Sequence, residues 1–276
     1  MTTAVSRPGA PRPVTPLTIL AHRLDELTRQ LETADGVDPV VTSGLRDASR
    51  LAGGLDPYLS QWTTPESPGL RLLSQRTEDK DWRLHDGDGT AAPLEQEMLS
   101  GHVEGQTLKM LVHATRARKV LEIGMFTGYA ALAMAEALPA DGEVISCELD
   151  AEVADFAQRC FRDSPDGSKI TVRVGPALAT LAELAAAGAV FDLVFIDADK
   201  AGYLGYLNAL LDHGLVAAHG LICVDNTLMQ GQPWRDGEPT ANGRAVAAFN
   251  QAVANDPRVE QVIIPLRDGL TLIREV

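Results

Sequence analysis

An alternation of apolar runs with helical segments begins at Lys119, continues to the C-terminus and strongly constrains the fold of this chain. The apolar runs are rich in β-branched residues, which favour strands, whereas the segments between them have helical composition. Strands that alternate with helices are typical of a mostly parallel sheet covered on both faces. The last two apolar runs surround "RDG", a turn signal that predicts an antiparallel hairpin. We therefore predict an α/β fold.

The residues before this alternation predict an N-terminal extension. Prolines and few apolar residues predict a disordered tail over residues 1–16. A helical extension is expected over residues 17–93, and the main domain over residues 94–276. The extension begins with leucines at three- and four-residue spacing, which are Leu17, Leu20, Leu24, Leu27 and Leu31.

Local signals predict where the helices of the extension begin and end. A second helix is expected over residues 40–53 and is ended by "LDPYLS". A third is expected to begin in "TTPESPGL", with Thr64 as N-cap and Pro65 at the first helical position. Residues 78–93 are polar and glycine-rich and predict a loop, and residues 94–115 then predict a helix.

Charge and cysteine content exclude several functions. The formal net charge is −14 and the pI is near 4.8, so the phosphate backbone of a nucleic acid would be repelled. We find no apolar run that could span a bilayer and no signal-peptide core, so we expect no membrane partner and a cytoplasmic location. Three scattered cysteines predict free buried thiols rather than disulfides or a zinc cluster.

Glycines follow the first predicted strand in "LEIGMFTGYAAL" (121–132). Ligands of open α/β sheets bind beyond the carboxyl ends of the strands, and glycine lets the backbone approach a ligand closely there. The dinucleotide fingerprint G-x-G-x-x-G is absent, since Glu122, Gly124 and Gly128 are spaced as E-x-G-x-x-x-G. This spacing favours a smaller nucleoside ligand over a dinucleotide. A plain turn between strand and helix would also use these glycines.

An acid follows the second strand, in "SCELD" (146–150). In nucleotide-binding α/β folds an acid at this place accepts hydrogen bonds from the ribose hydroxyls. We assign this role to Glu148 and expect Asp150 to cap the following helix. The alternative is that both acids are only helix caps.

Acids also follow two later strands, in "FDLVFIDADK" (191–200) and "LICVDN" (221–226). Asp197, Asp225 and Asn226 offer oxygen ligands, which suit a hard cation such as Mg²⁺, Mn²⁺ or Ca²⁺. Lys200 would lie beside that site and could act as a general base. Helix capping by the acids, and a solvated charge for Lys200, are the alternatives.

Taken in order, the motifs resemble the cation-dependent, S-adenosylmethionine (SAM)-dependent O-methyltransferases of the catechol and caffeoyl-CoA type. The resemblance covers roughly residues 94–276 and implies a Rossmann-like class I methyltransferase with a mostly parallel seven-stranded sheet and an antiparallel C-terminal hairpin strand. The matching segments are "VEGQTLKML" (103–111), "VLEIGMFTGYAALAMAEALP" (120–139), "GPAL" (175–178), "FDLVFIDADKAGYL" (191–204), "DNTL" (225–228) and "DPRVEQVIIPLRDGLTLIR" (256–274).

The resemblance implies a role for each candidate residue. Asp197, Asp225 and Asn226 would hold the metal, and Asp197 and Lys200 would be catalytic, with Lys200 removing the substrate proton or keeping the hydroxyl deprotonated. Ala130 stands where many relatives have a serine that helps bind the methionine carboxylate of SAM, so that contact is in doubt. The other SAM-binding residues would be Met98, Ser100, Glu122, Gly124, Met125, Glu148 at the ribose, Ala177 near the adenine and Asp199 near the methionine end.

The substrate is expected to be a small polyhydroxylated molecule with a vicinal diol or enediol. The extension and "EMLSGHVEGQTLKML" resemble a bacterial subgroup of secondary metabolism, tied to mycosporine-type sunscreens, that converts demethyl-4-deoxygadusol to 4-deoxygadusol. Alternatives are a catechol or caffeoyl-type natural product, an NAD-dependent oxidoreductase, or a non-catalytic SAM-binding protein. We expect a homodimer, with the N-terminal helices covering the substrate mouth or forming the dimer interface. They could also lack any catalytic role.

Overall fold

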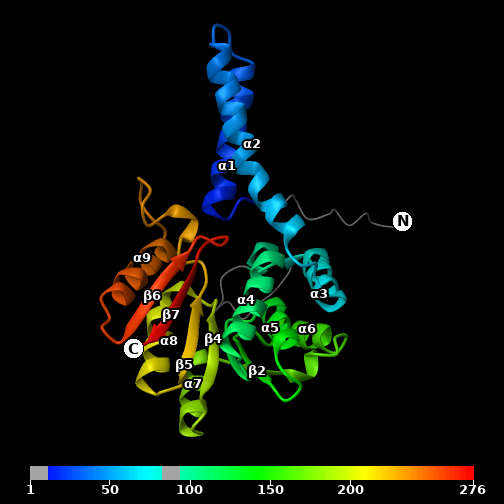
Figure 1. The fold of residues 1–276 in the computed structure, drawn as a ribbon, viewed down its shortest axis with the longest axis vertical. Coiled ribbons are helices and arrows are strands. Elements are labelled where there is room, and N and C mark those ends of the chain that lie inside the picture. Colours follow the sequence, from blue (N-terminus) through cyan, green and yellow to red (C-terminus); the bar gives the residue numbers. More distant parts are fainter. Residues whose placement is uncertain (1–11, 83–93) are drawn as a thin grey trace.

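A computed structural model of the chain describes residues 12–82 and 94–276 and contains one seven-stranded sheet (Figure 1). The strand order is β3-β2-β1-β4-β5-β7-β6, and all neighbours are parallel except β7, which is antiparallel to β5 and β6. The predicted α/β class, strand number and hairpin are confirmed. The strands are β1 (Lys119–Ile123), β2 (Glu143–Glu148), β3 (Ile170–Val174), β4 (Phe191–Ile196), β5 (Val216–Val224), β6 (Val259–Ile264) and β7 (Leu270–Glu275).

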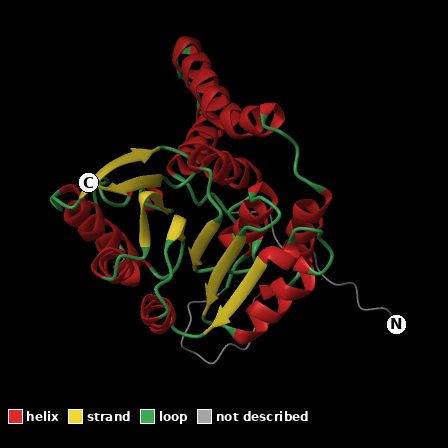
Figure 2. Ribbon diagram, turned by 60° about the horizontal axis from the view of Figure 1, so that its bottom comes forward, coloured by secondary structure: helices red, strands yellow, loops and turns green. Residues whose placement is uncertain are grey.

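Helices cover both faces of the sheet (Figure 2), because successive strand residues point to opposite sides. Val120 of β1 belongs to the core beneath α4, α5 and α6, whereas its neighbour Leu121 belongs to the core beneath α7, α8 and α9. The six helices are α4 (His102–Thr115), α5 (Tyr129–Ala137), α6 (Ala151–Phe161), α7 (Ala177–Ala186), α8 (Tyr203–Asp212) and α9 (Ala241–Ala254). Short 3₁₀ turns are η2 (Gln96–Met98), η3 (Gly167–Lys169), η4 (Lys200–Gly202) and η5 (Met229–Gly231).

The order of strands along the chain reverses between β1 and β4. Ile123 at the end of β1 pairs with Cys147 of β2 and with Ile196 of β4, and Ile196 pairs in turn with Val224 of β5. These four strands therefore end at one level. The residues that follow them meet along one edge, where ligands of open α/β sheets bind.

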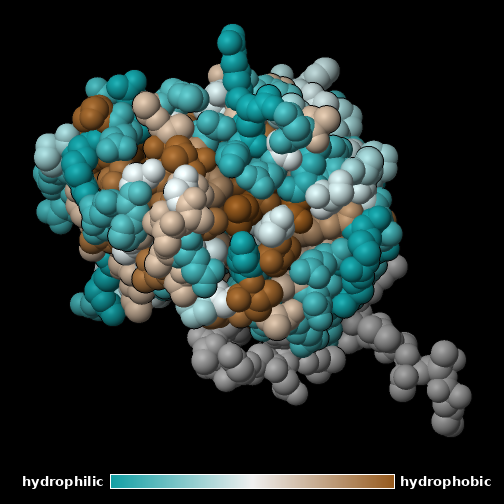
Figure 3. Space-filling model, turned by 90° about the horizontal axis from the view of Figure 1, so that it is seen from below, coloured by the Kyte–Doolittle hydropathy of each residue, from teal (hydrophilic) through white to brown (hydrophobic). Residues whose placement is uncertain are grey.

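The N-terminal extension has two different parts. α1 (Pro16–Glu32) and α2 (Pro39–Trp62) form a hairpin that projects from the body (Figure 1), and α2 has no buried residue. α3 (Pro68–Asp79) instead packs against α5 and α6. The base of α1 contacts η5 beyond β5, so the hairpin rises from the carboxyl end of the sheet. The opposite face carries a central apolar area within a largely polar surface (Figure 3).

Three predicted helix boundaries of the extension were wrong. α2 continues through Pro57 to Trp62, since the helix is exposed and water can reach the carbonyl that Pro57 leaves without a donor. α3 begins after Ser67, whose hydroxyl accepts from Leu70 N, because "SPG" repeats the Ser/Thr-Pro signal of Thr64 and Pro65. α1 begins at Pro16, inside the predicted tail, of which residues 1–11 lie outside the described residues.

Two further expectations on the helices have different outcomes. The helix predicted over residues 94–115 begins only at His102, because Gly101 has a φ of 79° and interrupts it. Asp150 caps α6 as predicted and accepts from the backbone N–H of Glu152 and Val153.

Of the predicted loop, residues 78 and 79 belong to α3 and residues 83–93 lie outside the described residues. No helix in the described ranges is long and apolar enough to cross a membrane.

Candidate active site

A pocket lies beyond the carboxyl ends of β1 and β4, where the strand order reverses. It is lined by the segment before α4, by the residues after β1 and by the end of β4. Six residues assigned from the sequence line it, which are Met98, Ser100, Glu122, Gly124, Met125 and Asp197. The fold therefore brings together most of the predicted cofactor residues of the first loop and of the segment before α4.

The glycine loop (residues 124–129) follows β1 and has an unusual backbone. Gly124, Phe126 and Gly128 all have positive φ angles, of 90°, 50° and 86°. A Cβ at Gly124 would lie 2.2 Å from the carbonyl oxygen of Asp197. Glycine is therefore required at 124, because the ends of β1 and β4 pass too closely for any side chain.

Glu148 lies at the end of β2 beside the glycine loop. Its Oε2 accepts from Phe126 N at 2.8 Å, and its Oε1 accepts from Asp150 N at 2.9 Å. Burial raises the pKa of this carboxyl. Each oxygen keeps a lone pair for another donor, so the carboxylate can still accept from a vicinal diol.

Glu122 is fully buried at the end of β1, and neither of its carboxyl oxygens has a hydrogen-bond partner with good geometry. Burial raises its pKa to about 8, and the nearby Asp197 and Glu148 act in the same direction. A buried acid without donors is costly in the absence of a ligand. Glu122 is therefore ready to accept hydrogen bonds from a cationic or N–H-bearing ligand in the pocket.

Asp197 and Asp225 follow the adjacent strands β4 and β5, and Asn226 comes next with a φ of 58°. Asp225 is 4% exposed, and its Oδ1 has no partner. Burial and the neighbouring Asp197 raise the pKa of Asp225 to about 6. In the described parts of the chain, this site included, no group of three or more His, Cys, Asp or Glu side chains could hold a metal ion. The set predicted from the sequence is not a group of this kind, because its third ligand is the amide oxygen of Asn226.

Lys200 points into this cluster rather than into solvent. Its Nζ donates to Asp197 Oδ1 at 3.0 Å, to the Ala198 carbonyl at 3.1 Å and to the Tyr203 hydroxyl at 2.6 Å. Tyr203 is fully buried and donates to the carbonyl of Asp225 at 2.9 Å. The ammonium group is thus held between the ends of β4 and β5.

Besides Glu148, three residues assigned to the cofactor do not line the pocket. Ala130 is buried in the core within α5, and Asp199 is exposed and accepts from the Tyr206 hydroxyl at 2.5 Å. Ala177 begins α7, after a loop in which Gly175 N donates to the carbonyl of Glu148 at 2.8 Å. Ala177 and Glu148 therefore lie on the same edge of the sheet.

Sequence reasoning missed Glu104 and Arg267. Glu104 is 1% exposed, its Oε1 has no partner, and its Oε2 lies 3.5 Å from Arg267 Nη1. Burial and then Asp225 raise its pKa well above the usual value. Arg267 also donates to the carbonyl of Leu99 at 3.0 Å and so connects the β6–β7 turn to the pocket wall. The only sequence signal was an acid in the first turn of the helix 102–115.

Comparison with known proteins identifies the family. The model of the O-methyltransferase family matches residues 86–276. Caffeoyl-CoA O-methyltransferase of Petroselinum crispum is 37% identical over 220 residues, which cover 76% of this chain and 85% of that protein. Caffeoyl-CoA O-methyltransferase 2 of Zea mays is 41% identical over 221 residues, 77% of each chain.

Two solved structures have the same fold. The SAH-bound methyltransferase PaMTH1 of Podospora anserina has a TM-score of 0.70 and 26% identity, and the match covers 82% of this chain and 96% of that one. TomG of Streptomyces achromogenes, solved in complex with SAM, has a TM-score of 0.66 and 27% identity over 81% and 96% of the chains.

The chain belongs to the O-methyltransferase family. It is a SAM-dependent O-methyltransferase of the caffeoyl-CoA type with a Rossmann-like fold, as the resemblance implied.

Proposed function

We propose that this enzyme binds SAM in the pocket beyond β1 and transfers its methyl group to one oxygen of a small vicinal-diol or enediol substrate held on a divalent cation. The observation that carries the proposal is the cluster of Asp197, Lys200 and Asp225 directly beside a pocket with an unpartnered buried acid. The SAM-bound and SAH-bound relatives support the choice of cofactor.

We assign Glu122, which lines the pocket, and Glu148, which lies beside the glycine loop, to opposite ends of SAM. Glu148 would accept from the ribose hydroxyls, because its oxygens keep free lone pairs beside the glycine loop. The unpartnered oxygens of Glu122 suit the ammonium group of the methionine part. Met98, Ser100, Gly124 and Met125 line the same pocket as Glu122, and Ala177 near the adenine and Asp199 near the methionine end stay predictions.

We assign the cation to Asp197, Asp225 and Asn226. The buried Oδ1 of Asp225 has no partner, and burial and then the neighbouring Asp197 raise the pKa of this carboxyl. A positive charge between the two carboxylates would offset both effects, so the residues fit Mg²⁺ or Mn²⁺. A bound cation would lower the pKa of a coordinated substrate hydroxyl. Lys200, whose Nζ lies 3.0 Å from Asp197 Oδ1, would take up that proton as the neutral amine or stabilise the oxyanion as the ammonium.

Methyl transfer itself needs little more than alignment. The oxyanion must point at the methyl carbon of the sulfonium, opposite the sulfur, and orientation of this kind contributes several kcal/mol. The positive and negative charges disappear together in the transition state. A water-poor site therefore favours the reaction. Glu104, Tyr203 and Asp225 are buried.

The assay uses labelled SAM with a catechol, a caffeoyl thioester and demethyl-4-deoxygadusol, each with Mg²⁺ and with EDTA. Transfer that EDTA abolishes and Mg²⁺ restores is expected. Transfer that persists in EDTA would contradict the cation assignment, and no transfer to any acceptor would favour a non-catalytic SAM-binding protein. The panel also separates the mycosporine-type substrate from the caffeoyl type. The caffeoyl-CoA O-methyltransferases among the plant relatives support the caffeoyl type.

We further propose that the enzyme is a homodimer in which the α1–α2 hairpin forms the interface. Exposed apolar side chains on α2 support this assignment, among them Val40, Leu51, Tyr58 and Trp62. The expected absence of nucleic-acid and membrane partners and the cytoplasmic location stay predictions.

A further inference from the structure

The described part of the N-terminal extension touches the glycine loop at three places. We call residues 64–82 the clamp segment, which comprises the end of the α2–α3 connection, α3 and the residues after it. Glu66, Thr77 and Trp82 of this segment contact Tyr129, Thr127 and Phe126 respectively. Those three partners all line the cofactor pocket.

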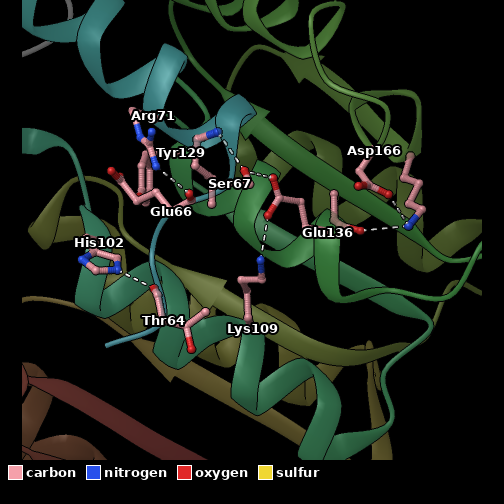
Figure 4. Close-up of polar contacts among 12 residues, drawn as sticks. Thr64, Glu66, Ser67, Arg71, His102, Lys109, Tyr129, Glu136 and Asp166 are labelled. Carbon is pink, nitrogen blue, oxygen red and sulfur yellow. Dashed lines mark hydrogen bonds and ion pairs between the residues drawn. The ribbon is translucent and has the colours of Figure 1, made fainter. Parts of the chain in front are cut away.

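The first contact joins Glu66 to Tyr129 (Figure 4). The Tyr129 hydroxyl donates to Glu66 Oε1 at 2.5 Å, and Tyr129 is 2% exposed. Its ring also occupies the space beside Gly105 of α4, where a Cβ would lie 2.7 Å from the ring. The ring therefore has a fixed position between the clamp segment and α4.

The other two contacts lie at the far end of the clamp segment. The hydroxyls of Thr77 and Thr127 are both fully buried and hydrogen-bond to each other at 3.0 Å. The Trp82 ring packs on the Phe126 ring with centroids 4.8 Å apart, and its Nε1 donates to the Thr77 carbonyl at 2.9 Å. Thr77 and Trp82 thus hold the loop as one unit.

Polar contacts anchor the clamp segment itself to the body (Figure 4). The Thr64 carbonyl lies 2.6 Å from His102 Nε2 at the start of α4. Ser67 donates to Glu136 of α5, and Glu136 in turn accepts from Lys109 of α4 at 2.7 Å. The segment is therefore attached to α4 and α5, which follow the two loops that line the pocket.

The glycine loop needs such support. Phe126 has a φ of 50°, which side-chain-bearing residues adopt only when their surroundings impose it. This conformation lets its backbone N–H donate to Glu148 Oε2 at 2.8 Å. Trp82 packs on the side chain of this same residue. Trp82 of the extension therefore packs on Phe126, whose backbone N–H orients the Glu148 carboxylate assigned to the ribose.

We propose that the clamp segment is a positioning element for SAM: Glu66, Thr77 and Trp82 hold the strained glycine loop in the conformation that binds the cofactor. This proposal rests on the proposed cofactor site. It gives the extension a role in cofactor binding that belongs to the clamp segment and not to the projecting hairpin.

The first test measures SAH binding by isothermal titration calorimetry. We expect Glu66→Ala to raise the Kd for SAH roughly fivefold to tenfold, because Tyr129 loses a charged hydrogen-bond partner, and Glu66→Gln to restore most of the affinity because it keeps an acceptor. The KM for SAM should rise more than kcat falls. Glu32→Ala is the matched control, since it removes a carboxylate that pairs with Arg46 inside the hairpin.

A lower Tm of Glu66→Ala with unchanged Kd and KM would overturn the proposal, because a merely structural contact behaves in that way. If Glu66→Ala does not fold, Thr77→Val serves instead, since it removes one hydroxyl at nearly constant volume. An unchanged Kd for SAH in Thr77→Val would likewise overturn the proposal. Failure of the unaltered enzyme to bind SAH would overturn the cofactor site as well, and this result separates the two claims.

The second test follows Trp82 directly. Trp62 and Trp234 are 69% and 60% exposed, whereas Trp82 is 4% exposed, so Trp62→Phe with Trp234→Phe leaves one buried reporter. Titration with SAH is expected to change the intensity or wavelength of its emission with the Kd found by calorimetry. Calorimetric binding without any change in Trp82 emission would contradict the coupling.

Discussion

At the scale of single residues, Asp197 connects the two halves of the site through three different groups. Its backbone N–H donates to the Ile123 carbonyl at 2.8 Å and so continues the pairing of β1 with β4. Its carboxylate accepts from Lys200 at 3.0 Å. Its carbonyl oxygen closes the space beside Gly124. The cofactor half and the cation half therefore share one amino acid.

Replacing the Asp197 side chain should separate catalysis from cofactor binding. We expect Asp197→Ala to lower kcat by roughly 100-fold or more, because a lost ligand forfeits several kcal/mol of transition-state stabilisation. The Kd for SAH should change little. Asp212→Ala is the control, as Asp212 forms an ion pair with Arg258 at the surface. Loss of both activity and SAH binding would mean that the two sites are one.

The raised pKa of Glu122 predicts a pH-dependent stability. Its pKa is about 8 in the folded protein, above the ordinary value of 4.5 that the unfolded chain has. The folded state therefore holds the proton more tightly, and this contribution to stability is complete below pH 4.5 and is lost as the pH rises to about 8.

Glu122→Gln should remove that part of the pH dependence. We expect the Tm of the ligand-free variant to exceed that of the unaltered protein by an amount that grows between pH 5 and about 8, because Gln cannot ionise. Thermal unfolding across this pH range is the measurement. Glu104, Glu148, Asp225 and Asp268 also have raised pKa values, so only the difference between the two proteins reports on Glu122. A constant difference would contradict the assignment.

At the scale of elements, the close passage of β1 and β4 leaves no freedom at Gly124. We expect Gly124→Ala to destabilise the protein by at least about 2–3 kcal/mol, because the new methyl would overlap Asp197 in a left-handed backbone conformation. Gly205→Ala in α8 is the control, since nothing lies within 4 Å of that position, and it should be neutral or stabilising. Denaturant unfolding compares the two, and equal stabilities would contradict the geometry.

The hairpin of α1 and α2 predicts an association that depends on its apolar face. We expect the unaltered protein to have twice the monomer mass of 29.5 kDa in sedimentation equilibrium. Leu51→Glu should shift it toward the monomer, because Leu51 is 81% exposed and a charge there cannot be buried in an interface. Gln61→Glu adds the same charge beside Trp62 and tests whether the effect depends on where on α2 the charge lies. A monomeric unaltered protein would exclude the hairpin interface.

The elements differ in how far the sequence predicts them. Period and residue type predicted the strands of the sheet, since a buried β-branched run has few alternatives. The start of α3 was misplaced because Thr64 and Ser67 are both followed by proline, and only the contact of Ser67 with Glu136 distinguishes them. Glu104 and Glu66 could not be assigned a role from the sequence. Their contacts are with Arg267 and Tyr129 respectively, which are distant in the chain.

At the scale of the whole molecule, cofactor binding should stabilise every part of the body. The pocket is built from the segment before α4, the glycine loop and β4, so the unfolded chain has no site. SAH at 100 times its Kd should therefore add about 2.7 kcal/mol to the free energy of unfolding. Differential scanning calorimetry measures the shift in Tm. Adenosine monophosphate is the control, and an equal shift with both ligands would contradict a specific site.

The pairing of β1 with β4 also has a kinetic consequence. Between these two strands the chain forms β2, β3 and three helices, so the pairing closes a long loop. Contacts that are distant along the chain form slowly, because the entropy of loop closure precedes the gain in contacts. Glu122 and Asp197 lie on either side of this pairing. We therefore expect the newly made enzyme to acquire secondary structure before it can recognise its cofactor, so that affinity for SAM marks completion of the native topology.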